Sequence, residues 1–156
     1  MRQLKWWPVW GLTKRLTERK PYATELMVET REKIFKSSLH IYPIDVGNAN
    51  DLNFDIRAIQ APQYNIHRFG IFFADVPRHA DVLLVLGRPT EMMVPVLMET
   101  ISQMSEPYSV VAIEREGSTG IEIDSINIPR PAVHIRDYKE PTDIIAVLLK
   151  IMGRES

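Results

Sequence analysis

The side chains that could do chemistry in this sequence gather first in residues 46–56, VGNANDLNFDI. This stretch follows a strand-like run at 39–45, and in α/β domains ligands collect in the loops at the carboxyl ends of strands. It contains small, amide and acidic side chains, with no thiol, lysine or histidine. The whole chain has no cysteine, which excludes disulfides, thiolate catalysis and cysteine-held zinc or iron–sulfur centres within it.

The elements that must position these residues alternate between strands and helices. Apolar runs predict strands at 39–45, 68–75, 80–87 and 109–115. Helical spacing predicts helices at 51–60, 88–104 and 140–153. This alternation predicts an α/β fold, a flavodoxin-like, three-layer open parallel sheet of about four strands with helices on both faces. Pro43 predicts an edge or an irregular end for the first strand, and residues 126–137, which contain two prolines, are expected to be extended.

The loops at the carboxyl ends of these strands are expected to carry any site. They are residues 45–51, 74–77, 87–90, 114–119 and 135–140. The first loop contains the run GNAND, and the run EGSTG (116–120) begins in the fourth, but neither run has the glycine spacing or the lysine of a phosphate-binding P-loop. Nucleotide binding is therefore disfavoured.

The first 37 residues are predicted to form a partly helical extension before a domain at 38–156. Residues 1–20 carry six basic side chains and one acid, whereas the other 136 residues carry 13 basic and 19 acidic groups, a net charge of −6. The extension contains a group of tryptophans and cations: Trp6, Trp7, Trp10, Lys14 and Arg15. Such groups are typical of membrane-surface anchors, and the alternative is that the aromatic rings pack on the domain or on another subunit.

Overall charge and hydropathy narrow the classes of partner. The net charge of the whole chain is −1, so nucleic acid is not an expected partner. No apolar run approaches the roughly 20 residues that span a bilayer, and no signal-peptide pattern is present. We therefore expect a protein on the cytoplasmic side of a membrane, attached peripherally.

Residues 61–90, APQYNIHRFGIFFADVPRHADVLLVLGRPT, resemble a known family. The segment is similar to the small, cluster-bearing subunit shared by respiratory complex I and the membrane-bound energy-converting [NiFe] hydrogenases. Asn65 stands where the family usually has Asp, and His79 is the form seen in the hydrogenase branch. The similarity covers roughly residues 38–152. The matching positions are Pro62, Tyr64, Arg68, Phe69, Gly70, Ile71, Pro77, Arg78, Ala80, Asp81, Gly87 and Thr90.

The resemblance implies a site for one [4Fe–4S] cluster, which family members hold through four cysteines. Counting back from Pro62 places the first two cysteines at Ala49 and Leu52. The third falls at Glu116, and the fourth falls near Asp137 or Tyr138. None of these residues is cysteine, so we expect neither the cluster nor any other cofactor or metal.

Another centre could in principle use the same pocket. Glu116, Asp137, Asp51 and His134 carry oxygen or nitrogen ligands of the kind that a hard cation prefers. Carboxylates in solvent-facing loops are usually only solvated, however, and the alanine and leucine at the first two positions bind nothing. A closed pocket is the favoured interpretation.

Four further residues occupy well-matched positions of the family pattern. Asp55 replaces a family glutamate associated with proton movement, and it is interpreted as a residual proton-relay or interface acid, or as an exposed helix carboxylate. Arg68, Arg78 and His79 are expected to fix loops or to contact a neighbouring large subunit. No catalytic residue is identified.

These features predict a non-catalytic structural or coupling subunit of a membrane-bound, ion-translocating assembly of the complex I or hydrogenase kind. The expected partners are a large subunit over residues 47–60, a membrane subunit near the tryptophans and a ferredoxin-like iron–sulfur subunit. One alternative is an electron-transfer subunit of a membrane oxidoreductase that uses another cofactor or a cluster ligated by a partner. Another is a free-standing flavodoxin-like binding protein.

Overall fold

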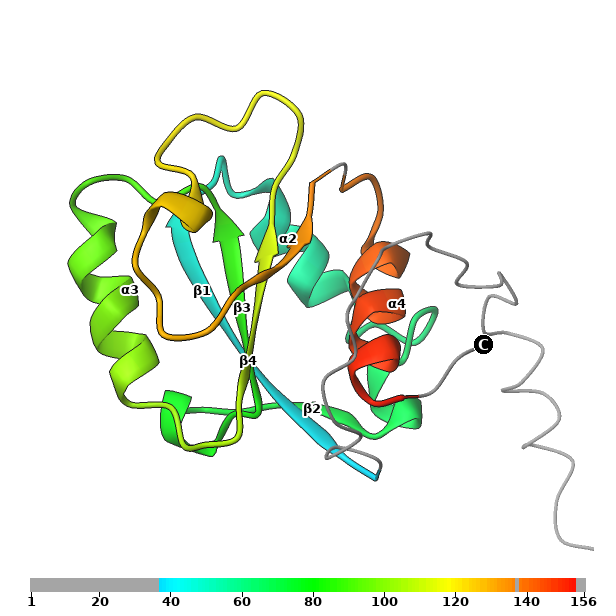
Figure 1. Cartoon of the computed structure of the whole chain (residues 1–156). Helices are drawn as coiled ribbons and strands as arrows, with labels where there is room; N and C mark the ends of the chain where they lie inside the picture. The colour runs from blue at the N-terminus through cyan, green and yellow to red at the C-terminus, as the bar shows by residue number, and fades with distance from the viewer. Residues whose placement is uncertain (1–36, 137, 154–156) are drawn as a thin grey trace, which may run out of the picture.

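The computed structural model describes residues 37–136 and 138–153, so the predicted N-terminal extension lies outside the described residues. The described part forms a parallel sheet between helical layers (Figure 1). Its strands are β1 (Leu39–Gly47), β2 (Ile71–Phe73), β3 (Val82–Gly87), β4 (Ser109–Ile113) and β5 (Val133–Ile135). They lie in the order β2-β1-β3-β4-β5, all parallel, which is the flavodoxin-like order. The predicted α/β fold is confirmed.

The helices lie on both faces of the sheet. Helices α2 (Asp51–Ala58) and α4 (Pro141–Ile151) cover one face, and α3 (Met93–Ser102) covers the other (Figure 1). Short 3-10 helices complete the described chain: η1 (Ile66–Phe69), η2 (Pro77–His79) and η3 (Ile123–Ser125). In the described part of the chain, every helix is too short or too polar to cross a bilayer.

Strand β3 shows why both faces of the sheet need a helical cover. All six of its residues are buried. Because successive side chains of a strand point to opposite faces, Leu84 and Leu86 join the core beneath α2 and α4, whereas Leu83 and Val85 join the core beneath α3. A strand that is apolar on both faces is typical of a parallel sheet covered on both sides.

Among the described residues the sheet has five strands, where the sequence predicted about four. The additional strand, β5, follows Pro129 and Pro131 and is three residues long. Such a short run has no periodicity that could identify it. Its strand conformation comes from pairing with β4, in which Val111 lies opposite Val133 and Ile113 opposite Ile135.

Strand β2 is shorter than the predicted strand at 68–75, and this leaves part of β1 unpaired on one side. It pairs with β1 only at residues 39–41. The Leu39 N–H donates to the Gly70 carbonyl, and the Ile41 carbonyl accepts from the Ala74 N–H, so these residues face β2. The backbone N–H and carbonyl groups of alternate strand residues point to the same neighbouring strand. The backbone of Pro43 therefore faces the side of β2, but it lies beyond the end of that strand. Its missing N–H therefore breaks no ladder hydrogen bond, and the predicted edge character is confirmed for this half of β1.

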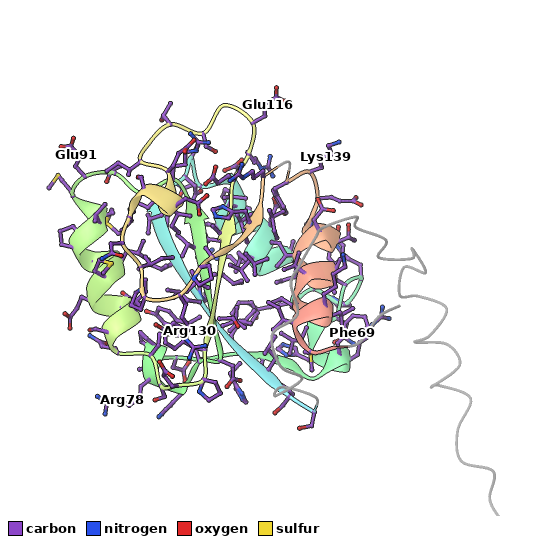
Figure 2. The ribbon with its side chains drawn as sticks, in the orientation of Figure 1. Phe69, Arg78, Glu91, Glu116, Arg130 and Lys139 are labelled. Carbon is purple, nitrogen blue, oxygen red and sulfur yellow. The ribbon has the colours of Figure 1, made fainter. Side chains whose placement is uncertain are left out.

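Because β2 is short, the loop that follows it lies at a different end of the sheet from the one that we expected. The last pair of β2 joins Phe73 to Ile41, and Ile41 also pairs with Val82 at the start of β3. Residues 74–77 therefore lie near the amino end of β3, and their expected place among the ligand loops at the carboxyl ends is wrong. In Figure 2, Arg78 lies at the opposite end of the molecule from Glu116.

Candidate functional site

Three segments that the sequence assigned to the cluster site meet at the carboxyl edge of the sheet. Backbone hydrogen bonds join the segment after β4 to the segment before α4: the Glu114 N–H donates to the Ile135 carbonyl at 2.9 Å, and the Tyr138 N–H donates to the Glu114 carbonyl at 3.3 Å. Side chains of Arg115 and Tyr138 reach α2, the helix after β1. Glu116 and Lys139 lie at this same end of the molecule (Figure 2).

A group of four side chains, which we name the Arg115 cluster, occupies this meeting point. Arg115 Nη2 donates to Asp55 Oδ2 at 2.6 Å, and the Tyr138 hydroxyl donates to the same oxygen at 2.9 Å. Arg115 Nε lies 3.0 Å from Asp51 Oδ2, an ion pair in which the N–H is not aimed as a hydrogen bond requires. The guanidinium carbon lies 5.1 Å from the centre of the Tyr138 ring, which is a cation–π contact.

The members of the Arg115 cluster differ in burial. Tyr138 is buried in the core beneath α2 and α4, and the Asp55 side chain is 22% exposed. The Arg115 and Asp51 side chains are 37% and 40% exposed, so solvent screens their pairing. Burial, and then the hydrogen bond to Asp55, raises the pKa of Tyr138 above the range of an ordinary tyrosine, so this phenol keeps its proton at an alkaline pH where an ordinary tyrosine ionises.

The predicted ligand positions now have definite surroundings. Leu52 is buried in the core, whereas Ala49 and Glu116 are exposed. Asp137 lies outside the described residues. A [4Fe–4S] cluster requires four thiolates, but the site offers a core leucine, an exposed methyl group and an exposed carboxylate. The donor set therefore does not fit the cofactor that the family pattern implies.

The side chains considered for a hard cation are engaged separately. Asp51 pairs with Arg115, and His134 Nε2 lies 2.7 Å from Asp124 Oδ1. Within residues 37–136 and 138–153, no three His, Asp or Glu side chains come together as a set that could hold a metal ion.

The loop between β1 and α2 is held by its own polar side chains. Asp45 Oδ1 accepts from the N–H groups of Gly47 and Asn48, and its Oδ2 accepts from Asn53 Nδ2 at 2.6 Å. Partial burial alone would raise the pKa of Asp45, but these hydrogen bonds outweigh it and hold the pKa below its ordinary value. The amide and acidic residues of this loop thus define the path of the backbone into α2.

A second ion pair lies beside the Arg115 cluster. Arg88, directly after β3, donates from Nε to Oε2 of the buried Glu114 at 2.8 Å. These two residues, with Glu116, Glu122 and His134, line part of a cavity of about 300 Å³. Sequence inspection missed Arg88, Glu114 and Arg115. The signal that could have identified Arg115 is its place beside the predicted ligand position 116.

Arg68, Arg78 and His79 lie away from this site. Arg68 lies in η1, with its guanidinium 4.5 Å from the centre of the Phe69 ring, and Arg78 and His79 are exposed in η2. Figure 2 shows Phe69 and Arg78 at the opposite end of the molecule from Glu116. Within the described residues the Asp55 side chain contacts Arg115 and Tyr138, and no contact joins it to Arg68, Arg78 or His79. Trp6, Trp7, Trp10, Lys14 and Arg15 lie outside the described residues.

A groove lies beside the unpaired half of β1. It has a volume of about 560 Å³, and its lining includes Pro43, Phe54, Arg57, Phe73 and Leu86. Phe54 projects from α2 with 68% of its surface exposed. This surface combines an apolar ring with a sheet edge that β2 leaves open.

Comparison with known proteins places these features in a family. An uncharacterized protein of Methanocaldococcus jannaschii is 32% identical over 130 residues, which cover 78% of this chain and 87% of that protein. An NADH-quinone oxidoreductase subunit of Beutenbergia cavernae is 34% identical over 65% of this chain. Formate hydrogenlyase subunit 7 of Escherichia coli is 31% identical over 56% of this chain. The aligned regions span 54% and 34% of those last two relatives.

The solved structures support the fold. A chain from the membrane-bound sulfane sulfur reductase, an archaeal respiratory membrane complex, superimposes with a TM-score of 0.61 at 21% identity, covering 79% of this chain and 75% of that chain. No family model matches the sequence. The sequence relatives and the family pattern in residues 61–90 agree, and the chain therefore belongs to the family of small subunits found in complex I and in membrane-bound hydrogenases.

Proposed function

We propose that this chain is a non-catalytic structural or coupling subunit of a membrane-bound, ion-translocating assembly of the complex I or hydrogenase kind, and that it holds no [4Fe–4S] cluster. The observation that carries this proposal is that the first two predicted ligand positions hold side chains that cannot bind iron. Leu52 lies in the core, and Ala49 bears only a methyl group. The chain has no thiolate to offer at any other position.

The proposed partners follow from the surfaces around α2. A large hydrogenase-like or quinone-reductase-like subunit would cover residues 47–60, where the exposed Phe54 and the groove of about 560 Å³ offer an apolar anchor point. A membrane-arm subunit would lie near the tryptophans and cations of residues 1–20, and a ferredoxin-like iron–sulfur subunit could complete the assembly. The chain itself would be peripheral, on the cytoplasmic face.

Such a subunit cannot relay electrons by the route that a four-cysteine cluster provides. Either the assembly performs no electron transfer through this position, or a partner supplies the path. In both cases the contribution of this chain is mechanical, because it holds neighbouring subunits in register while ion movement belongs to the assembly.

Metal analysis tests the absence of the cluster. The full chain, expressed alone and purified under anaerobic conditions, is expected to contain neither stoichiometric iron nor acid-labile sulfide. Four iron atoms per chain would overturn the proposal. Iron that appears only in the purified complex and depends on this chain would instead support the electron-transfer alternative with a partner-ligated cluster.

Affinity purification from detergent-solubilised membranes of the native host tests the assembly. The tagged chain is expected to retain a large subunit and membrane subunits. Phe54→Ser should weaken retention of the large subunit. Met92→Ser is the matched control, because Met92 is 86% exposed and lies immediately before α3 on the other face of the sheet. Equal retention by both variants, or recovery of the wild-type chain without membrane subunits, would contradict the proposed partners.

A further inference from the structure

The three segments at the carboxyl edge are joined in two different ways. Backbone hydrogen bonds of Glu114 connect the segment after β4 with the segment before α4. The polar links to α2 come from side chains, through Asp51 and Asp55 on the helix and Arg115 and Tyr138 on the other two segments. The Arg115 cluster thus joins α2 to both of the other segments.

Each member of the Arg115 cluster lies within three residues of a lost ligand position. Asp51 lies between positions 49 and 52, and Asp55 lies about one helical turn after position 52. Arg115 precedes position 116, and Tyr138 is one of the two residues near which the fourth position falls. The same three segments that would supply cysteines therefore supply the charges and the phenol.

We propose that the Arg115 cluster is a non-covalent cross-link that replaces the family's iron–sulfur cluster as the connection between these three segments. The inference rests on the proposed absence of the [4Fe–4S] cluster and goes beyond it, since an abandoned site could equally have become an open, solvated gap. Here a guanidinium, two carboxylates and a buried phenol bridge it, beside the cavity of about 300 Å³ that Arg115 and Glu116 also line.

Asp55 is the centre of the cross-link. Its Oδ2 accepts from both Arg115 and Tyr138, so one oxygen connects α2 to both other segments. Tyr138 is buried and needs a hydrogen-bond partner, which Asp55 provides. Removal of the Asp55 charge affects both contacts, and its effect cannot add independently to the effect of removing Arg115.

The experiment is a double-mutant cycle read by local hydrogen exchange on the full chain. The variants are Asp55→Asn, Arg115→Gln and the two combined, with Tyr138→Phe as a conservative variant that keeps the Arg115–Asp55 pair. Peptides covering residues 112–120 are expected to exchange roughly tenfold faster in either single variant, which corresponds to about 1.4 kcal/mol of local opening free energy. The double variant should exchange no faster than the faster single variant, and Tyr138→Phe should have a smaller effect.

The matched control is Arg136→Gln. Arg136 also pairs with a carboxylate near this edge, 3.1 Å from Asp124, but its side chain is 72% exposed. It should leave exchange at residues 112–120 unchanged. Additive effects of Asp55→Asn and Arg115→Gln on exchange, or an equal effect of Arg136→Gln, would overturn the proposed cross-link. Neither result would bear on the proposed absence of the [4Fe–4S] cluster, which the metal analysis tests separately. Stoichiometric iron in the isolated chain would overturn the proposed function whatever the cycle shows.

Discussion

The Tyr138 hydroxyl donates a hydrogen bond to Asp55 Oδ2 at 2.9 Å, although 83 residues separate the two in the sequence. Tyr138 is buried at the start of the segment leading into α4, and Asp55 lies in the middle of α2. The bond joins α2 to the segment that leads into α4, the other helix on this face of the sheet, and it places a titratable phenol in the core.

This bond predicts a particular loss of stability at alkaline pH. The folded-state pKa of Tyr138 lies above its unfolded value of about 10, so its contribution is complete below pH 10 and is lost as pH rises further. Tyr138→Phe should cost about 1 kcal/mol at pH 8. The difference in melting temperature between wild type and variant should then narrow from pH 9.5 to pH 11.5. A constant difference over that range would contradict the buried donor role, and recovery on return to pH 8 serves as the control.

Asp45 predicts the opposite behaviour at acid pH. Its folded-state pKa is lowered, so its contribution is present above the unfolded value near 4 and is lost as pH falls through the folded value. Asp45→Asn should cost less than about 1 kcal/mol at pH 7, because the side chain is exposed and water screens it. The difference between wild type and variant in the free energy of unfolding, measured with urea, should shrink as the pH falls from 4 to 2. Asp75→Asn, a change at another aspartate outside the β1–α2 loop, is the control, and an identical pH response of the two variants would refute the role of Asp45.

We expect that position 47, at the end of β1, has no room for a side chain. Its φ is +150°, and a Cβ there would lie 2.5 Å from the Arg88 carbonyl oxygen. Gly117 has a φ of +82°, but a Cβ at that position would have no atom within 4 Å outside residues 116–118. Gly117→Ala should therefore cost about 1 kcal/mol from backbone strain alone, whereas Gly47→Ala should cost about 3 kcal/mol because the backbone must also move. Equal unfolding free energies for the two variants would show that the close approach at Gly47 is unimportant.

Leu52 and Ala49 should respond very differently to substitution, although both stand at predicted ligand positions. Leu52→Ala removes a fully buried side chain and should cost about 2–5 kcal/mol. Ala49→Ser, at an exposed position, should change stability by less than about 0.5 kcal/mol. Chemical denaturation measures both. A small effect at Leu52 would mean that position 52 is not part of the core.

Elements with a strong local pattern could be predicted from the sequence. The two-sided apolar run became β3, and the stripe of residues after Pro141 became α4. The motif in residues 61–90 was sufficient to identify the family, and the family pattern indicated the segments that meet at the carboxyl edge. The strand and helix patterns are local because burial imposes a period of about two residues on a strand and about 3.6 on a helix.

The tertiary structure decided what local pattern does not encode. Strand β5 exists because three residues pair with β4, and Pro43 lies at an edge because β2 ends early. Arg115 reads in the sequence as a turn residue beside glutamates, yet its guanidinium reaches Asp55 across 60 residues. Such contacts depend on the order of the strands and on which loop ends they bring together. The residue types at the predicted ligand positions could therefore be read from the sequence, whereas the side chains that meet there were decided by the fold.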